Sequence, residues 1–386
     1  MTKGCMVAVE NRGGNGSNTE NLHAVPVVCN TESGSEKQHS PALSRERKMA
    51  SIQRVVGVNP IQNADAIEAS KILGWTVVTK KGEFKVGDLC VYVEIDALLP
   101  ERPEFEFMRS KKFRIKTVRL RGQVSQGIAF PLSILGGVEE KPEGLELFEG
   151  VDVSEILGIV KYEPPVDAAI GGEISRPMPG FLLKTDEPRI QSIPGVLERH
   201  AGKIGYVAEK LEGASGTFYV KNGVFGVCSR NFELREDHQN IFWLVARKLN
   251  LEEKLLSLGG DFAVQGEVIG PKIQGNLYRL KEPAVRFFNL FDIENSEYLS
   301  FCEFKKIVSE RLGLPLVPIL DENYPLPSCV DELIGYAEGK SALEGCSDVE
   351  REGIVWRPLE ETRDPDIGRL SVKAVSNRYL LKQGKD

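Results

Sequence analysis

The stretch that decides the fold is VAEKLEG at residues 207–213, an apolar strand that ends in an acid, a lysine and a glycine turn. A lysine at the end of such a strand is poorly placed for a solvated surface charge, because the rigid strand aims it into whatever pocket the strand lines. The short pattern also occurs by chance, so a surface lysine is the alternative interpretation. Lys210 is therefore the first candidate site residue.

Three more charged residues lie in apolar strands downstream. VQGEVIG at 264–270 contains Glu267, EGIVWRP at 352–358 begins with Glu352, and LSVKAV at 370–375 contains Lys373. A buried charge needs a partner, so an internal salt bridge explains each residue taken alone. Together, in the order Lys, Glu, Glu, Lys, they suit chemistry at phosphorus. One lysine can attack, the carboxylates can hold a divalent metal, and the second lysine can neutralise phosphate oxygens.

This order resembles the covalent lysine nucleotidyltransferases, the superfamily of ATP- and GTP-using ligases and RNA capping enzymes. KLEG at 210–213 is similar to motif I of that superfamily, and the CSRN segment around Arg230 is similar to the arginine motif that follows. Motifs III, IIIa, IV and V have their counterparts in VQGEVIG, FFNLFDI at 287–293, EGIVWRP and LSVKAVSNRYLLK. The spacings from Lys210 also fit, with 20 residues to Arg230, 57 to Glu267, 142 to Glu352 and 163 to Lys373.

Within the superfamily, the closest resemblance is to the Deinococcus-type RNA ligases, a branch of the phage RNA ligase 2-like enzymes. KTDEPRIQ at 184–191, the Gly74-Trp75 pair with residues 87–96, and VRLRGQVSQG at 118–127 carry this resemblance. It covers about residues 50–382 and implies an OB-like domain ahead of the catalytic domain. In DNA ligases and capping enzymes the OB domain follows instead, so the domain order disfavours a DNA ligase.

The resemblance implies a role for each matched residue. Lys210 would attack the α-phosphorus of ATP to give lysyl-AMP, and Lys373 would neutralise the phosphate. AMP would then pass to an RNA 5′-phosphate, and a 3′-hydroxyl would displace it. Phe288 would stack on adenine, with core packing as the alternative, and Arg230 would bind a phosphate or the nick, with a surface arginine as the alternative. The implied cofactor-binding residues are Glu209, Glu212, Arg230, Glu267, Phe288, Glu352 and Lys373, and Glu267 and Glu352 would hold Mg²⁺ or Mn²⁺.

Two positions depart from the family motifs. Glu212 stands where motif I usually has Asp or His, which would shift the contact with ribose. Val375 stands where motif V often carries a second lysine. Phosphate neutralisation would then fall mainly on Lys373, with Lys382 or Arg378 as candidate helpers.

The fold class predicted is α+β, with an OB-like β-barrel followed by a nucleotidyltransferase domain of antiparallel sheets with flanking helices. Residues 1–48 have the composition of a disordered tail, 49–162 form the OB-like nucleic-acid-binding domain, 163–180 connect, and 181–386 form the ligase adenylyltransferase domain. Asn222-Gly223 predicts a type I′ hairpin. Helices are expected at 240–258, 301–312 and 331–343.

Charge is segregated within the first domain, although the whole chain has a net charge of only −7. Residues 109–121 hold seven basic residues and no acid, whereas 139–155 hold seven acids and one lysine. Phe113 and Ile115 alternate with cations at period two, which predicts a strand with one cationic face that follows a phosphate backbone. A solvated surface is the alternative. The predicted nucleic-acid contacts are Lys112, Arg114, Lys116, Arg119 and Arg121.

The seven cysteines are scattered and odd in number, which favours free thiols in a reducing compartment, cytoplasmic or nuclear. With four dispersed histidines, a zinc site has little support. The expected partner is RNA or a nicked duplex with an RNA 3′-hydroxyl end, bound by a monomer with no membrane contact. The alternative function is an RNA-binding OB protein whose nucleotidyltransferase domain is inactive.

Overall fold

The computed structural model describes residues 47–137, 146–163 and 173–383. The predicted tail lies outside these ranges except for its last two residues. Half of the predicted connection at 163–180, residues 164–172, lies outside them as well, and its last part carries β10, Ile174–Pro177. No helix in the ranges described is long and apolar enough to cross a membrane.

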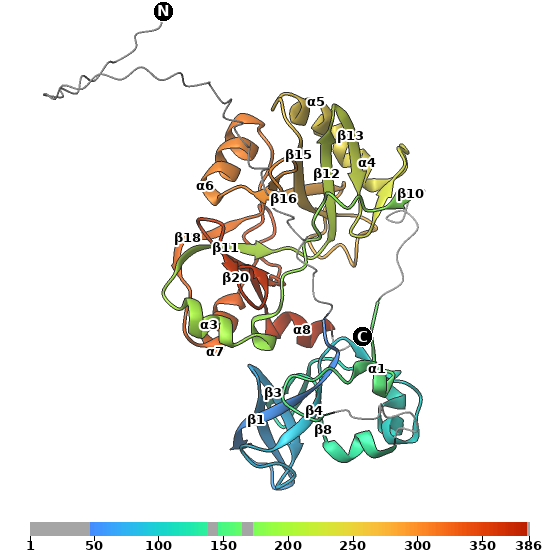
Figure 1. Ribbon diagram of the computed structural model, residues 1–386, viewed down its shortest axis with the longest axis vertical. Helices are drawn as coiled ribbons and strands as arrows, with labels where there is room; N and C mark the ends of the chain where they lie inside the picture. The colour runs from blue at the N-terminus through green and yellow to red at the C-terminus, as the bar shows by residue number, and fades with distance from the viewer. Residues whose placement is uncertain (1–46, 138–145, 164–172, 384–386) are drawn as a thin grey trace, which may run out of the picture. The chain divides into compact units, whose positions relative to one another are not determined.

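The first half of the chain is built on a five-stranded antiparallel sheet in the order β3-β2-β1-β4-β8 (Figure 1). Its strands are β1 (Ala50–Pro60), β2 (Ile67–Ile72), β3 (Trp75–Lys80), β4 (Leu89–Val93) and β8 (Ile128–Pro131). Two short pairs accompany it, β5 (Ala97–Leu98) with β9 (Val160–Lys161), and β6 (Val118–Leu120) with β7 (Gln123–Ser125). The helical turns η1 (Pro103–Lys111), η2 (Leu132–Gly137) and α1 (Ser154–Leu157) complete this half. Trp75, Tyr92 and Phe105 fill its core.

The prediction that residues 109–121 form a cationic strand is wrong. Its first residues end the 3₁₀ helix η1, and Lys112 and Phe113 have positive φ values of 52° and 57°, a left-handed turn that interrupts any strand. The chain becomes extended only afterwards and reaches β6 at Val118. The predicted alternation is confirmed next to this turn, because Phe113 and Ile115 are buried and Arg114 between them is partly exposed.

The second half contains two antiparallel sheets, one of seven strands and one of four. The seven-stranded sheet runs β10-β14-β13-β12-β15-β16-β17, and the four-stranded sheet runs β18-β11-β19-β22. The strands of the first are β10 with β12 (Ala214–Lys221), β13 (Val224–Cys228), β14 (Phe232–Leu234), β15 (Phe262–Ile269), β16 (Ala284–Asp292) and β17 (Glu297–Tyr298). Those of the second are β11 (Ile204–Lys210), β18 (Ile319–Pro325), β19 (Gly353–Pro358) and β22 (Val372–Val375), and a small hairpin joins β20 (Arg363–Asp364) to β21 (Gly368–Arg369).

The predicted hairpin and helices are present, with shorter helices than expected. Asn222 and Gly223 adopt φ values of 51° and 74° between β12 and β13, as a type I′ turn requires. The helix expected at 240–258 is two helices, because Asn250 adopts a left-handed φ of 52°. The helices are η3 (Ile190–Ser192), α3 (Gly195–His200), α4 (Ile241–Lys248), α5 (Leu251–Leu256), α6 (Phe301–Phe304) continuing into η4 (Lys305–Arg311), α7 (Val330–Ala337) and α8 (Asn377–Gln383).

Helices pack on both of these sheets. α4 and α5 pack on β13 and β12 (Figure 1). Phe242 and Trp243 lie in the shared core. α7 packs on β19 and β22 around the buried Trp356. The helix expected at 331–343 ends at Ala337, and the chain beyond it returns toward β19 through the bridge of Lys340 with Glu350.

Candidate active site

The centre of the site is an ion pair between two strands of the four-stranded sheet. Lys210 ends β11, and its register partner on β19 is Gly353, so the preceding Glu352 stands next to it. The Nζ atom of Lys210 donates to Oε1 of Glu352 over 2.6 Å. Burial acts to lower the pKa of Lys210, but the Glu352 and Glu267 carboxylates outweigh it and raise this pKa above its ordinary value. The sequence prediction that these two residues share a site agrees with this geometry.

Glu267 comes to the site from the other sheet. It lies on β15, where it pairs in register with Ser215 of β12 and Arg286 of β16. Burial, reinforced by the Glu352 charge, raises the pKa of Glu267 to about 8, although Lys210 acts in the opposite direction. The two sheets thus bring both predicted carboxylates to the same lysine.

Lys373 supplies the second cation from β22. Val355 of β19 is its register partner, and its backbone N–H donates to the carbonyl of Pro188 over 3.0 Å. Burial, together with the charges of Lys210 and Arg189, lowers the pKa of Lys373 to about 8. The four predicted residues therefore form one electrostatic cluster.

The glycines of the two short motifs are required by close backbone approaches. A Cβ atom on Gly213 would lie 2.4 Å from the carbonyl oxygen of Val268 and 2.8 Å from Cγ of Glu267. A Cβ atom on Gly353 would lie 2.2 Å from the carbonyl oxygen of Ala374. Each glycine lets an element pass close beside a site residue, and this is the physical reason for glycine after KLE and after Glu352.

Arg189 is a site residue that sequence reasoning missed. It forms a parallel bridge with Lys373, and its Nη2 donates to Oδ2 of Asp96 over 2.9 Å. Its Nε and Nη1 are buried and have no hydrogen-bond partner among the residues described. Burial, only partly offset by Asp96, lowers the pKa of Arg189. Two free guanidinium donors beside Lys373 suit an anionic ligand. The only sequence signal was its place in KTDEPRIQ.

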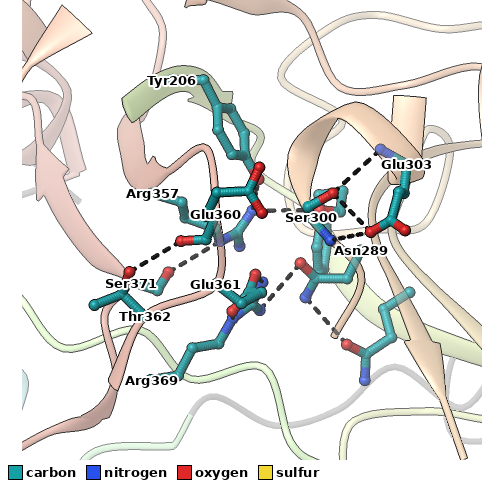
Figure 2. Close-up of polar contacts among 12 residues, drawn as sticks. Tyr206, Asn289, Ser300, Glu303, Arg357, Glu360, Glu361, Thr362, Arg369 and Ser371 are labelled. Atoms are coloured by element: carbon teal, nitrogen blue, oxygen red, sulfur yellow. Dashed lines mark hydrogen bonds and ion pairs between the residues drawn. The ribbon is translucent and has the colours of Figure 1, made fainter. Parts of the chain in front are cut away.

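Glu187 and Arg357 form a second pair that was not predicted. Arg357 is 2% exposed, and its Nη2 donates to Oε1 of Glu187 over 2.7 Å. Arg357 also donates to Ser371 Oγ at 3.0 Å and to the Tyr206 hydroxyl at 3.3 Å (Figure 2). Burial acts to raise the pKa of Glu187, but Arg357 and Lys373 hold it below its ordinary value. Glu187 therefore links this buried network to the site lysine.

Phe288 occupies a β-bulge in β16. Gln265 of β15 pairs with Asn289 and the next residue, Gly266, pairs with Phe287, so Phe288 has no partner across the ladder. A bulge of this kind redirects a side chain next to a site. Arg357 steadies it, because its Nη1 donates to the Phe288 carbonyl over 3.3 Å and its guanidinium lies 5.7 Å from the ring centroid. The predicted adenine-stacking residue is thus partly buried beside the site.

A second polar chain runs beside Arg357 and fixes the strands on which Glu267 and Phe288 stand. Arg369 donates to Oδ1 of Asn289 over 3.1 Å, and Asn289 donates to Gln265 over 3.1 Å (Figure 2). Gln265 in turn donates to the carbonyl of Leu183 over 2.8 Å. Each of the two interior amides is therefore both a donor and an acceptor, which satisfies these buried groups.

Glu209 and Glu212, two predicted cofactor-binding residues, lie before and after Lys210 in the sequence. Glu209 is buried, and its Oε2 accepts the backbone N–H of Ala342 over 2.6 Å, so it braces the loop after α7. Burial and the Glu352 charge raise the pKa of Glu212. Its backbone N–H donates to the Tyr278 hydroxyl over 2.9 Å.

Arg230 lies at the exposed edge of the site. Its Nη2 donates to Asp186 Oδ2 over 2.6 Å, and both side chains are nearly half exposed. Its charge acts to lower the pKa of Glu267. Of the two candidate helpers of Lys373, Arg378 pairs with Glu338 over 3.2 Å, and Lys382 is exposed.

Comparisons with known proteins agree with this arrangement. A model of the RNA ligase family matches residues 205–375, and a model of an OB-fold domain matches residues 49–132. The RNA ligase of Naegleria gruberi is 38% identical, and its apo mutant structure superposes with a TM-score of 0.79 over 88% of this chain and 99% of that one. This chain belongs to the RNA ligase family.

Two further structures of the Naegleria ligase are similar to this ligase. A mutant with ATP and Mn is 38% identical, with a TM-score of 0.79 over 87% of this chain and 99% of that one. The same ligase with PPi is 38% identical, with a TM-score of 0.79 over 88% and 100%. No curated protein matches the chain at a significant level. The predicted fold class and the predicted enzyme class, a ligase, are confirmed.

The residues at the site fit the divalent metal predicted for this ligase. Oε2 of Glu352 is buried and has no hydrogen-bond partner in the ranges described, and Glu352 raises the pKa of Glu267. A cation bound between the carboxylates of Glu352 and Glu267 would give the free oxygen of Glu352 a partner and would stabilise the ionised form of Glu267. Within the described chain no three His, Cys, Asp or Glu residues gather as a metal site. Mg²⁺ commonly takes one or two carboxylates and completes its shell with water and phosphate.

The predicted nucleic-acid residues of the ligase are not gathered at this cluster. Lys112, Arg119 and Arg121 are exposed on the first half of the chain, and Arg119 donates to the carbonyl of Gly122 over 3.0 Å. Arg114 is partly buried, since its guanidinium stacks 3.9 Å from the Tyr162 ring and lies 3.9 Å from Asp96. Lys116 is partly exposed.

Proposed function

We propose that this RNA ligase joins a 3′-hydroxyl to a 5′-phosphate through a lysyl-AMP on Lys210, with ATP as the nucleotide. Nζ of Lys210 would form a bond to the α-phosphorus as the bond to pyrophosphate breaks. The observation that carries the proposal is the 2.6 Å contact of Lys210 with Glu352 beside the cations Lys373 and Arg189. The Naegleria structures with ATP and with PPi support the choice of nucleotide.

The chain supplies both a proton acceptor and charge neutralisation. An attacking lysine must be neutral, and Oε1 of Glu352 is within hydrogen-bond distance of the proton that Lys210 has to lose. Lys373 and the two free donors of Arg189 would balance the charge that develops on the phosphate oxygens. Glu267 and Glu352 would hold Mg²⁺ or Mn²⁺, which when bound supplies further charge neutralisation at phosphate. One structure of the Naegleria ligase contains Mn.

The other predicted residues take supporting roles in this proposal. Phe288 would stack on adenine at the bulge that Arg357 steadies, and Glu209 and Glu212 would position the nucleotide by fixing the segments on either side of Lys210. Arg230, at the exposed edge, would contact a phosphate of the nucleotide or of the nick after leaving Asp186.

The finer classification, substrate and setting are also proposals. The OB-fold match ahead of the ligase match supports the Deinococcus-type branch. The domains proposed are a tail at 1–48, an OB-like domain at 49–162, a connection at 163–180 and an adenylyltransferase domain at 181–386. RNA or a nicked duplex with an RNA 3′-hydroxyl end would be bound by a monomer through Lys112, Arg114, Lys116, Arg119 and Arg121. The free cysteines found among the described residues are consistent with a cytoplasmic or nuclear location.

One experiment separates this proposal from an RNA-binding protein with an inactive transferase domain. The protein is incubated with α-labelled ATP and Mg²⁺ or Mn²⁺, and a covalent adduct is sought on a denaturing gel. We expect label on the wild type and none on Lys210→Ala. An unlabelled wild type would favour the inactive alternative. Sealing of nicks with ribose or deoxyribose at the 3′-hydroxyl then tests the predicted need for ribose.

A further inference from the structure

A cavity of about 350 Å³ lies between strands β1 to β3 of the first half and the segment that carries η3, α7 and the start of α8. One wall is a tight backbone contact, since the N–H of Gly74 donates to the carbonyl of Gln191 over 2.8 Å. A Cβ atom on Gly74 would lie 2.8 Å from Cα of Gln191, so this wall has no room to move. The cavity is of the size that small organic ligands occupy.

Two side-chain amides at this cavity lack partners. Gln191 is 2% exposed, and neither its Nε2 nor its Oε1 has a hydrogen bond to any described residue. Oδ1 of Asn377, which also lines the cavity, is buried and unpaired in the same sense. A buried amide without partners is costly. The three atoms therefore indicate a ligand that offers both donors and acceptors.

The charges at the cavity favour a neutral ligand. Among the described residues of its lining, the only ionic side chains are Lys71 and Asp331, and Nζ of Lys71 lies 3.3 Å from both carboxylate oxygens of Asp331. A phosphate would meet this carboxylate, and the lining residues that the structure describes would offer it no free cation. Pro60, Val124 and Ile334 add apolar surface that suits the faces of a flat ring.

We propose that this cavity binds one unstacked base of the RNA strand that the ligase seals. A carboxamide pairs with two adjacent groups on a base edge, and proteins read RNA chiefly through such splayed bases. Gln191 stands two residues after Arg189, which bridges to Lys373, so a base held here is attached to a strand that ends near the site. The inference rests on the proposed function, because it requires an RNA substrate.

The test is a double-mutant cycle in which the RNA base and the Gln191 amide are removed separately and together. Nicked substrates with a preformed 5′-adenylate carry one abasic residue at each position around the nick in turn, and single-turnover sealing is measured. We expect one abasic position to slow the wild type about 5- to 10-fold, as the loss of a neutral hydrogen bond would. Gln191→Met, which keeps the side-chain length, should lose the same factor on intact RNA and nothing more on that abasic substrate.

The alternatives give different results. A cavity that holds only water would show no position where the two losses overlap, and this overturns the proposal. The proposal is also overturned if Gln191→Met slows the sealing of every substrate, abasic or intact, by the same factor. Asn377→Ala should show overlap at the same position, which guards against a folding defect in one variant. His238→Ala, which lines a separate surface hollow, is the matched control and should change nothing. Self-adenylylation of the wild type and of Gln191→Met should be equal, so failure of the proposed function would be seen separately.

Discussion

Lys210 donates to Glu352 across the pairing of β11 with β19, with 2.6 Å between Nζ and Oε1. The same carboxylate raises the pKa of its partner lysine and that of Glu267. The resting site therefore stores the lysine in its charged form, next to the group that can take its proton.

Replacing Glu352 by glutamine should change both the rate and its pH dependence. The loss of the proton acceptor should slow self-adenylylation by on the order of 10²-fold or more. Because Glu352 raises the pKa of Lys210, the rising limb of the residual pH–rate profile should move to lower pH. Single-turnover labelling across pH 6 to 10 measures both effects. Glu294→Gln, at an exposed position, should leave rate and profile unchanged, and a profile of Glu352→Gln that stays in place would contradict this account.

Glu267→Gln should make the protein more stable while it abolishes ligation. The pKa of Glu267 is about 8 in the folded state against 4.5 ordinarily, so the folded protein binds the extra proton between these values. Stability is therefore lost as the pH rises from about 4.5 to 8. The variant should melt at least about 2 °C above the wild type at pH 8 and by a smaller margin at pH 5. Exposed Glu297→Gln serves as control. An equal gain at both pH values would refute the assignment.

Lys373→Met should have the mirror-image pH dependence. The folded pKa of Lys373 is about 8 and its ordinary value is 10.5, so the unfolded chain binds more protons between these values. Burial of the charged Lys373 therefore destabilises the folded protein fully below pH 8, and this destabilisation disappears as the pH rises toward 10.5. We expect a melting temperature above that of the wild type at pH 7 and a smaller difference at pH 9.5. The exposed Lys306→Met variant should show no such trend. If the gain in melting temperature of Lys373→Met increases with pH, the prediction is wrong.

Asp96→Asn should weaken self-adenylylation through Arg189. Asp96 receives Arg189 at 2.9 Å, Arg47 at 3.4 Å and Arg114 at 3.9 Å, and its φ of 71° holds it in a left-handed conformation. Loss of its charge should raise KM for ATP by about 10-fold, as expected for one charge-assisted contact. Asp96→Glu should restore part of the affinity. Asp331→Asn, which removes the exposed Lys71 pair, should have no effect on KM. If Asp331→Asn raises KM for ATP as much as Asp96→Asn does, the effect does not depend on the contact of Asp96 with Arg189.

Gly353→Ala should destabilise the four-stranded sheet by about 1–3 kcal/mol, because the new Cβ would press on β22. The nearest atoms are the Ala374 carbonyl oxygen at 2.2 Å and Val375 Cα at 2.9 Å. Chemical denaturation measures the loss. Gly335→Ala in α7 is the matched control, because nothing lies within 4 Å of its Cβ position, and it should be neutral or slightly stabilising. A neutral Gly353→Ala would contradict the packing described.

The sequence predicted the strands of Lys210, Glu267 and Lys373 because charged residues in apolar runs stand out locally. It could not predict Asp96 with Arg189, or Glu187 with Arg357, because these pairs join residues 93 and 170 positions apart. The basic run was assigned to a strand on its period of two, yet the left-handed residues Lys112 and Phe113 interrupt it. Neither residue type favours that conformation, so tertiary packing overrides the local pattern there.

The bulge at Phe288 fixes the phase of the whole β16 strand. Val285 and Phe287 before the bulge and Leu290 after it belong to the same core cluster, so the alternation of side chains changes its phase at Phe288. Deletion of Phe288 itself would restore a regular ladder and leave both halves of the strand facing as they do, whereas deletion of a residue elsewhere in β16 would restore it only by turning one half of the strand over. In this ligase the length of β16 is therefore as constrained as the identity of its side chains.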